Sequence, residues 1–370
     1  MDFDFADLLL QVMERNASDL HLTAGSPPMI RQHGKLHAMD YPRLTPQVTR
    51  EVIYSILTND QRQKLETDWQ IDLAYSIPGK ARFRVNAYFQ RASLSAAFRL
   101  IPHEMPRLGT LGVPPVLEEF TKKPRGFVLV TGPTGSGKST TLAALIDEIN
   151  RKRSDHIITI EDPIEFLHRH KRCIVNQREL GPDAVSFAEA LRGALRQDPD
   201  VILLGEMRDL ETISTALTAA ETGHLVFATV HTQDASSTVD RLIDVFPAEQ
   251  QGQVRTQIAS TLQGVVTQTL LPTADGQGRA PAVEILFPDD AVRNLIRQAK
   301  VEQIYSVMQT GTKRGMVTLE QSLADLVLRK IVDEDVALSR SSRPEQLRTF
   351  INRISAEPEA TAGGLRVAGG

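Results

Sequence analysis

The chain has 370 residues, a length that predicts two or three domains with ample buried cores. Hydrophobic residues make up 41% of it and charged residues 24%, the balance of an ordinary globular protein. The formal net charge of -4 argues against a general nucleic-acid binder, and the single cysteine excludes an intramolecular disulfide or a cysteine-based zinc site.

The first residues, Met1 to Phe5, are acidic where a signal peptide would be basic. No apolar run approaches the roughly 20 residues that cross a bilayer. We therefore expect a cytoplasmic protein whose membrane contacts are made through partners.

Residues 1–102 predict a small α+β domain. Apolar residues recur at helical spacing from Phe5 to Met13, and residues 18–22 alternate as a strand does. One helix is expected from Thr45 to Leu65, with Thr45 as its N-cap. Three further strands are expected at residues 71–76, 81–90 and 93–100.

Residues 103–120, rich in proline and glycine, predict a linker. From 121 to 270, short apolar runs alternate with helical segments, as in a parallel sheet covered on both faces. These runs are residues 127–130, 157–160, 201–204 and 225–230. Helical patterns predominate over 271–355, including 290–300 and 319–330, and residues 356–370 have the composition of a disordered tail.

A phosphate-binding loop stands at residues 132–140, which match the pattern GxxxxGK[ST] between an apolar strand and a helix. Its glycines let backbone N–H groups turn toward the β-phosphate. Lys138 supplies positive charge to the β- and γ-phosphates, and Ser139 a hydroxyl to Mg²⁺. The strand–loop–helix context disfavours a turn that binds nothing. The predicted nucleotide contacts are Gly132, Pro133, Thr134, Gly135, Ser136, Gly137, Lys138, Ser139 and Thr140.

Two acidic clusters follow apolar runs. Glu161, Asp162 and Glu165 come after residues 157–160, and Asp200 and Glu206 flank the next run. A carboxylate at the carboxyl edge of the sheet can orient the attacking water or hold Mg²⁺ through water. Any one of them alone would equally suit a solvated loop residue or a helix cap.

His224 and His231 flank the run 225–230, where one or both could face the phosphates. A pair of hydrogen-bonded structural histidines is the simpler alternative. In the first domain, Arg84 and Arg99 sit between apolar neighbours on strands. They suit either a solvated sheet face or an arginine supplied to a γ-phosphate across a boundary.

These motifs, in this order, resemble the type II/type IV secretion ATPase superfamily and, within it, the PilT-type pilus retraction ATPases. The resemblance covers about residues 3–353. The segments that carry it are Ala17–Leu22, the loop 132–140, Ile160–Phe166, Gly205–Asp209 and Thr222–Thr232.

The resemblance implies a PAS-like N-terminal domain, a RecA-like ATPase core, a helical C-terminal region and assembly as a homo-hexamer. It implies ATP and Mg²⁺ as ligands, and an inner-membrane pilus platform protein as partner at the cytoplasmic face. A paralogous retraction ATPase is a further partner that it allows, and direct nucleic-acid binding is not expected.

The resemblance also assigns roles. Glu161, Asp162 and Glu165 form its Asp box, with Glu165 activating water. Its Walker B motif spans Asp200 to Glu206 and its His box contains His224 and His231. The catalytic set it implies is Lys138, Glu165, Glu206, His231, Arg84 and Arg99.

Residues 291–300 are similar to a helix motif associated with retraction in PilT-type proteins. Val292 and the pair Gln298–Ala299 depart from its commoner form. By spacing alone, apolar positions form one stripe of this helix, opposite Arg293, Arg297 and Lys300.

Four alternatives compete with a retraction motor. A PilU-type accessory ATPase is similar throughout, whereas assembly ATPases usually add N-terminal domains and a four-cysteine zinc element that this sequence lacks. A RecA-like nucleic-acid motor needs basic or aromatic surfaces, but aromatic residues are only 5%. A nucleotide-regulated scaffold would not need Lys138, Glu165 and Glu206.

Overall fold

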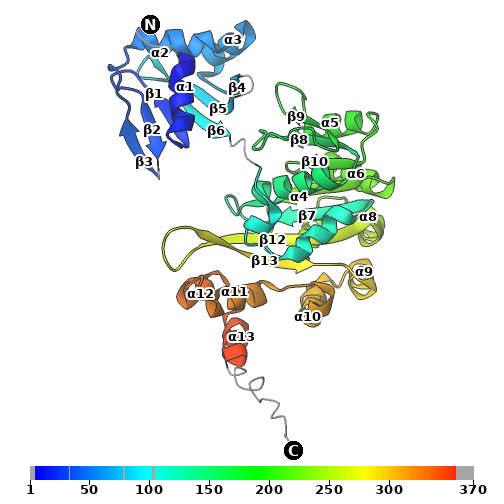
Figure 1. The fold of residues 1–370 in the computed structure, drawn as a ribbon. Helices are drawn as coiled ribbons and strands as arrows, with labels where there is room; N and C mark the ends of the chain where they lie inside the picture. The colour runs from blue at the N-terminus through cyan, green and yellow to red at the C-terminus, as the bar shows by residue number, and fades with distance from the viewer. Residues whose placement is uncertain (1–4, 33, 78–79, 102–104, 356–370) are drawn as a thin grey trace, which may run out of the picture. The chain divides into compact units, whose positions relative to one another are not determined.

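The computed structural model describes residues 5–32, 34–77, 80–101 and 105–355, so the predicted tail 356–370 lies outside it. The chain divides into two compact units. The first contains the described residues up to Met105 together with Glu165–Leu167, and the second contains the rest (Figure 1). None of the helices in these ranges is both long and apolar enough to span a bilayer.

The first unit is a six-stranded antiparallel sheet with helices, in the order β3-β2-β1-β6-β5-β4. Side chains from all three of its helices share one core with alternate residues of the strands, among them Leu8, Phe83 and Phe98. Its elements are α1 (Phe5–Glu14), β1 (Asp19–Leu22), β2 (Met29–Gln32), β3 (Lys35–Ala38), α2 (Pro46–Ser55), α3 (Asn59–Asp68), β4 (Gln70–Ile77), β5 (Ala81–Gln90) and β6 (Ser93–Ile101).

The predicted α+β domain is therefore present, with two differences. The single helix expected over 45–65 is two helices, because Thr58 starts α3 with a capping box. Its hydroxyl accepts from the Gln61 backbone N–H at 3.3 Å, and the Gln61 amide accepts from Thr58 N–H at 3.0 Å. Strands β2 and β3 were not predicted, and all four residues of β3 are exposed, so its burial does not alternate.

The second unit is a seven-stranded sheet in the order β13-β12-β7-β11-β10-β8-β9, parallel except for the β12–β13 pair. Its strands are β7 (Gly126–Thr131), β8 (His156–Glu161), β9 (Ile174–Glu179), β10 (Val201–Leu204), β11 (Leu225–Val230), β12 (Leu262–Pro272) and β13 (Arg279–Leu286). This confirms the predicted α/β core with a mostly parallel sheet.

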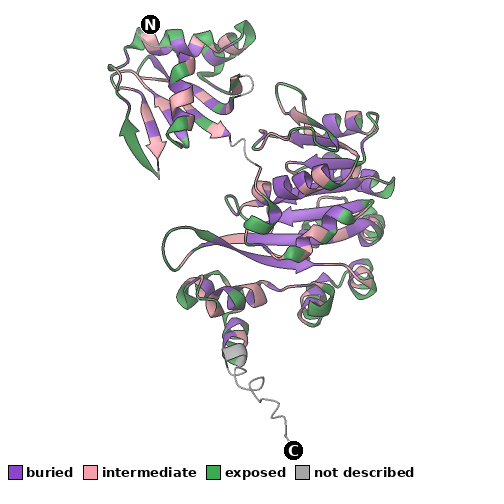
Figure 2. Ribbon diagram, viewed as in Figure 1, coloured by how far each residue is buried: buried purple, intermediate pink, exposed green. Residues whose placement is uncertain are grey.

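Both faces of this sheet are covered. On β7, Phe127 and Leu129 point into one core with helices α5 (Phe187–Ala194), α6 (Leu210–Glu221), α7 (Ala235–Asp244) and α8 (Ala248–Thr261). Val128 and Val130 point into the other, with α4 (Lys138–Lys152). The inner strands are accordingly buried along their length in Figure 2.

Part of the predicted linker 103–120 is folded onto this core. It forms two 3-10 helices, η1 (Leu108–Thr110) and η2 (Pro115–Lys122). Leu117 and Phe120 are fully buried in the α4-side core. The burial of these apolar side chains, and not the prolines around them, determines that this segment packs onto the core.

The region expected to be helical from 271 begins instead with a hairpin, since β12 runs to Pro272 and β13 ends at Leu286. The apolar run in β13 is a buried strand, which periodicity does not separate from a buried helix. Helices follow it: α9 (Asp290–Arg297), η3 (Val301–Gln303), α10 (Ile304–Thr310), η4 (Thr312–Arg314), α11 (Leu319–Leu328), α12 (Glu334–Arg340) and α13 (Pro344–Ser355).

The α9 helix differs from its predicted face pattern. Val292 and Ile296 are buried as expected, but Ala299 is exposed. Arg293 is half-buried and donates to Ala259 O in the last turn of α8 and, at 3.0 Å, to the carbonyl of its C-cap residue, Leu262. It is therefore a C-terminal cap of α8 and not a surface cation. Burial, followed by the nearby Arg297, lowers its pKa.

A buried carboxyl group joins the sheet to a helix start. Glu284 on β13 is only 3% exposed and accepts from the backbone N–H of Ala235, the first residue of α7, at 2.7 Å. Burial outweighs this hydrogen bond and raises the pKa of Glu284 from 4.5 to about 7.

Glu284 should make stability depend on pH. Between pH 4.5 and about 7 the folded state keeps a proton that the unfolded state has lost, so stability falls as pH rises through this window. The loss is on the order of 3 kcal/mol. Thermal unfolding of Glu284→Gln should lack this slope, whereas a Glu249→Gln control, at an exposed residue of α8, should retain it. Equal slopes in all three proteins would contradict the assignment.

Candidate functional site

The phosphate-binding loop joins β7 to α4, as predicted. Gly132, Gly135 and Gly137 have φ angles of 134°, 77° and 90°, values that favour glycine. A Cβ at Gly132 would lie 2.2 Å from Gln268 O, and one at Gly137 would lie 2.6 Å from Gln268 Nε2. At Gly132 and Gly137 the loop thus packs against β12 with no space for a side chain.

Gln268 fixes the loop from β12. Its Oε1 accepts from Thr141 Oγ1 on α4 at 2.7 Å, and one residue earlier Thr267 Oγ1 lies 2.9 Å from Thr131 Oγ1 at the end of β7. The strand before the loop and the helix after it are therefore both tied to β12. The sequence analysis missed Gln268, although the three polar residues 267–269 within an otherwise apolar run were a signal.

Lys138 lies inside the loop and is only 8% exposed. Its Nζ donates to Gly132 O at 2.8 Å and Pro133 O at 3.0 Å. Ser136 is 2% exposed, and its Oγ makes no hydrogen bond within the described ranges. A buried hydroxyl without a partner, beside a lysine held by loop carbonyls, fits a cradle that receives phosphate oxygens.

Glu206 follows β10 and lies beside Arg208 and His231. Arg208 donates to its two oxygens at 2.5 and 2.6 Å, and His231 Nε2 lies 3.3 Å from Oε1. The other ring nitrogen of His231 is 3.5 Å from Lys138 Nζ. Burial raises the pKa of Glu206, but the hydrogen bonds from Arg208 and the charges of His231 and Arg208 bring the net shift below its ordinary value. Glu206 is therefore an ionised carboxylate connected through His231 to the loop lysine.

Parallel strands bring several predicted residues to one edge. The strand ends at Glu161, Glu206 and His231 meet there beside the loop, and Gly205 N–H donates to Ile160 O at 2.8 Å. Glu161 Oε1 accepts from Thr159 Oγ1 at 2.6 Å and from Gln177 Nε2 at 3.1 Å.

Asp200 and His224 lie at the opposite edge, because each precedes its strand. The six residues of β11 separate His224 from His231 by roughly 20 Å. His224 Nδ1 lies 2.9 Å from Ala219 O, and Asp200 accepts from His156 N–H at 2.8 Å. The structure therefore places only His231 of the two histidines beside the loop, and Asp200 tethers the start of β8.

Asp162 and Glu165 lie in the loop after β8, and both are exposed.

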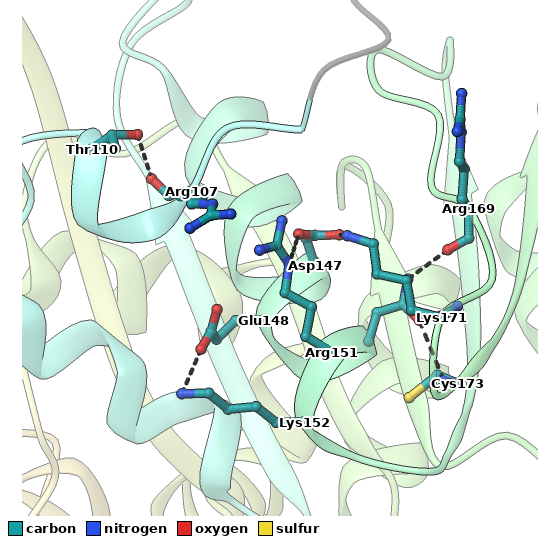
Figure 3. A network of polar contacts seen from close by, with 10 residues as sticks. Arg107, Thr110, Asp147, Glu148, Arg151, Lys152, Arg169, Lys171 and Cys173 are labelled. Carbon is teal, nitrogen blue, oxygen red and sulfur yellow. Dashed lines mark hydrogen bonds and ion pairs between the residues drawn. The ribbon is translucent and has the colours of Figure 1, made fainter.

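A further group of polar contacts anchors α4 to the segment before β9 (Figure 3). Asp147 pairs with Arg151 at 2.6 Å and with Lys171, and Asn150 Nδ2 donates to Arg169 O at 2.7 Å.

Arg84 and Arg99 belong to the first unit, where they are exposed cross-strand neighbours on β5 and β6. Arg99 Nε donates to Asp19 Oδ1 at 2.9 Å. Asp19 is 7% exposed, and burial opposes its ionisation, but hydrogen bonds from Ser18 and Arg99 lower its pKa overall. A buried carboxylate on β1 therefore orients one of the two predicted arginines.

Within the described ranges, no group of three or more His, Cys, Asp and Glu residues is arranged to hold a metal. A magnesium ion at this site would depend on nucleotide phosphates and on Ser139, which is partly buried in the first turn of α4. That donor set, one hydroxyl beside a phosphate cradle, fits Mg²⁺.

A family comparison decides the class of this site. The profile of the family described as "Type II/IV secretion system protein" matches residues 4–362. The chain belongs to that family. The sequence resemblance is thus confirmed across nearly the whole chain.

Individual members of the family are similar over most of their length. The type IV pilus retractation ATPase PilT of Pseudomonas aeruginosa is 50% identical over 342 residues, covering 92% of this chain and 99% of that protein. The twitching motility protein of Neisseria gonorrhoeae is 48% identical, covering 86% of each. A crystal structure of the pilus retraction motor PilT with bound ADP has a TM-score of 0.88 and 48% identity, covering 94% of this chain and 99% of that one.

The close packing of the loop on β12 predicts a selective loss of nucleotide binding. Gly132→Ala should displace the loop, because its Cβ would overlap Gln268 O, and should abolish the rise in unfolding temperature that ATP produces. Gly223→Ala is the control, since its φ of 111° imposes similar strain while nothing lies within 4 Å. Equal ATP-induced shifts in the two variants would refute this account of the loop.

Proposed function

We propose that this protein is a ring motor of the type II/IV secretion family that couples ATP hydrolysis to type IV pilus retraction. The observation that carries the proposal is identity of 50% to a pilus retraction ATPase across nearly the full length of both chains. The intact phosphate loop with Lys138, Glu206 and His231 around it supports a working ATPase over a scaffold. The same identity favours retraction over the PilU-type, assembly and nucleic-acid alternatives.

In the proposed mechanism, ATP binds with its phosphates in the loop 132–140. Lys138 exchanges its two loop carbonyls for phosphate oxygens, and the Ser136 hydroxyl acquires a partner. Ser139 is assigned to Mg²⁺, which neutralises charge on the β- and γ-phosphates when bound. Glu206 is held as a carboxylate by Arg208, so it can accept a hydrogen bond from a water at this edge.

Glu165 is assigned as the residue that orients the attacking water, and His231 links Glu206 to Lys138. Arg84 and Arg99 are assigned to the developing charge of the γ-phosphate, from the same or a neighbouring subunit. Loss of that phosphate would release the arginines and let the first unit rotate against the second.

The proposal includes a homo-hexamer in the cytoplasm, associated with the inner membrane through a pilus platform protein, and allows for a paralogous retraction ATPase. Family membership supports an oligomeric motor. No nucleic-acid substrate is proposed, since the net charge is -4 and aromatic residues are 5%.

Hydrolysis should require both the loop lysine and the ring. Steady-state ATPase activity of the purified protein should rise with concentration, together with a six-subunit species seen by light scattering. Lys138→Ala should reduce kcat by a factor of about 100 or more, since it removes the charge that stabilises the phosphates. Lys138-dependent activity from a monomer would leave an enzyme but not this motor.

Arg99 should contribute to turnover beyond its contact with Asp19. Arg99→Ala should lower kcat by about 1,000-fold, the effect of removing an arginine from a phosphoryl-transfer site. It should also lower the unfolding temperature, because the buried Asp19 carboxylate loses this donor. Arg50→Ala, which removes an exposed cation from α2 of the same unit, should leave kcat unchanged. An Arg99→Ala enzyme with normal kcat would remove this arginine from the mechanism.

A further inference from the structure

The loop that carries Glu165 spans residues 162–167, between β8 and the segment that leads to β9. Side chains of β9 contact this loop and the residues that flank it. On β9, Gln177 and Glu179 share one face, because they are two residues apart. Both side chains accept from backbone N–H groups here, Glu179 from Ile164 inside the loop and Gln177 from His168 just after it.

Gln177 holds both ends. Its Oε1 accepts from the backbone N–H of His168 at 2.7 Å, and its Nε2 donates to Glu161 Oε1 at 3.1 Å. Glu179 adds a third contact, since its Oε2 accepts from the Ile164 backbone N–H at 3.2 Å. The atoms so held belong to Glu161, four residues before Glu165, to Ile164, directly before it, and to His168, three residues after it.

The strand that supplies these contacts is itself fixed. It is paired in parallel with β8 along its whole length, from His156↔Ile174 to Glu161↔Glu179. The residues just before it are tied to α4 by Asn150, whose Oδ1 accepts from Lys171 N–H at 3.1 Å (Figure 3). The helix that starts at the phosphate loop and the strand that holds the Glu165 loop therefore form one connected framework.

We propose that Gln177 is a positioning residue for ATP hydrolysis, which fixes the loop 162–167 at both ends and so holds Glu165 in place to orient water. This inference rests on the proposed role of Glu165. A side-chain amide suits the position because it donates through nitrogen to a carboxylate while it accepts through oxygen from a backbone N–H. Neither a carboxylate nor an apolar side chain can do both at neutral pH.

A modest displacement of Glu165 would be costly, because misplacing a reacting group by about 1 Å can reduce the rate by about 100-fold. Gln177→Ala should therefore lower kcat by about 10- to 100-fold. KM for ATP should change little, since the phosphate loop and its contacts with β12 do not involve Gln177.

The test is a double-mutant cycle with ATPase readout, made from Gln177→Ala, Glu165→Gln and their combination. If Gln177 acts through Glu165, its substitution should have no further effect on kcat once Glu165 is changed. Asn176→Ala is the matched control, because it removes the neighbouring amide of β9, whose partner is His156 Nε2 at 2.8 Å. That control should keep normal kcat.

Two further measurements separate positioning from folding. Hydrogen exchange of the peptide over residues 161–168 should accelerate in Gln177→Ala, with the unfolding temperature nearly unchanged. Gln177→Glu places two carboxylates together at neutral pH, so it should lose activity there and recover part of it at lower pH, where a shared proton restores the contact with Glu161.

Each outcome bears on one claim. Normal kcat in Glu165→Gln would sink the proposed role of Glu165, while accelerated exchange would still show that Gln177 holds the loop. The positioning role itself fails if Gln177→Ala lowers kcat equally with and without Glu165, or if it leaves kcat and exchange unchanged. If Gln177→Ala does not fold, the pH profile of Gln177→Glu decides, and a profile parallel to that of the wild type overturns the inference.

Discussion

The contact between Gly132 and Gln268 is the constraint on which the nucleotide site depends. A phosphate loop needs backbone N–H groups that converge, and convergence needs glycine angles that no neighbouring side chain obstructs. Here strand β12 imposes that requirement. The backbone carbonyl of Gln268 occupies the space beside Gly132, and the Gln268 side chain holds Thr141. The loop is therefore formed against a strand that joins the sheet far later in the chain.

Around this loop, polar contacts connect the strand end to the loop lysine. Glu206 lies between Arg208 and His231, and His231 lies between Glu206 and Lys138. The Arg208 guanidinium limits the cost of partly burying the Glu206 carboxylate. A phosphate bound by Lys138 would therefore be linked to Glu206 through the His231 ring.

The parts of the site that the sequence predicted are those whose chemistry is local. The glycines and Lys138 stand within one short segment, and the parallel strands indicated that Glu161, Glu206 and His231 would share an edge. Asp200 and His224 were grouped with them by motif, but strand direction carries both to the other edge. The strand direction alone predicts this separation.

Residues that act through distant partners were not predictable. Gln268 and Gln177 matter because of what lies across the sheet from them, and a polar residue in a strand gives no indication of its partner. The helix boundary near Thr58 is a different case, because its capping signal was present in the sequence but was outweighed by the continuous polar–apolar pattern. Fold class follows from pattern, whereas positioning follows from tertiary contacts.

The cap that Arg293 places on α8 affects how substitutions within the helix motif of residues 291–300 should be interpreted. A motif is commonly dissected by exchanging its charged residues, on the assumption that each charge is available to a partner. Among the three basic residues of 291–300, the exposed Arg297 and Lys300 meet that assumption, whereas the Arg293 guanidinium is committed to carbonyls at the end of a neighbouring helix. A motility defect from a substitution at 293 would thus reveal a displaced helix, and defects at 297 or 300 would be the ones that describe a binding surface.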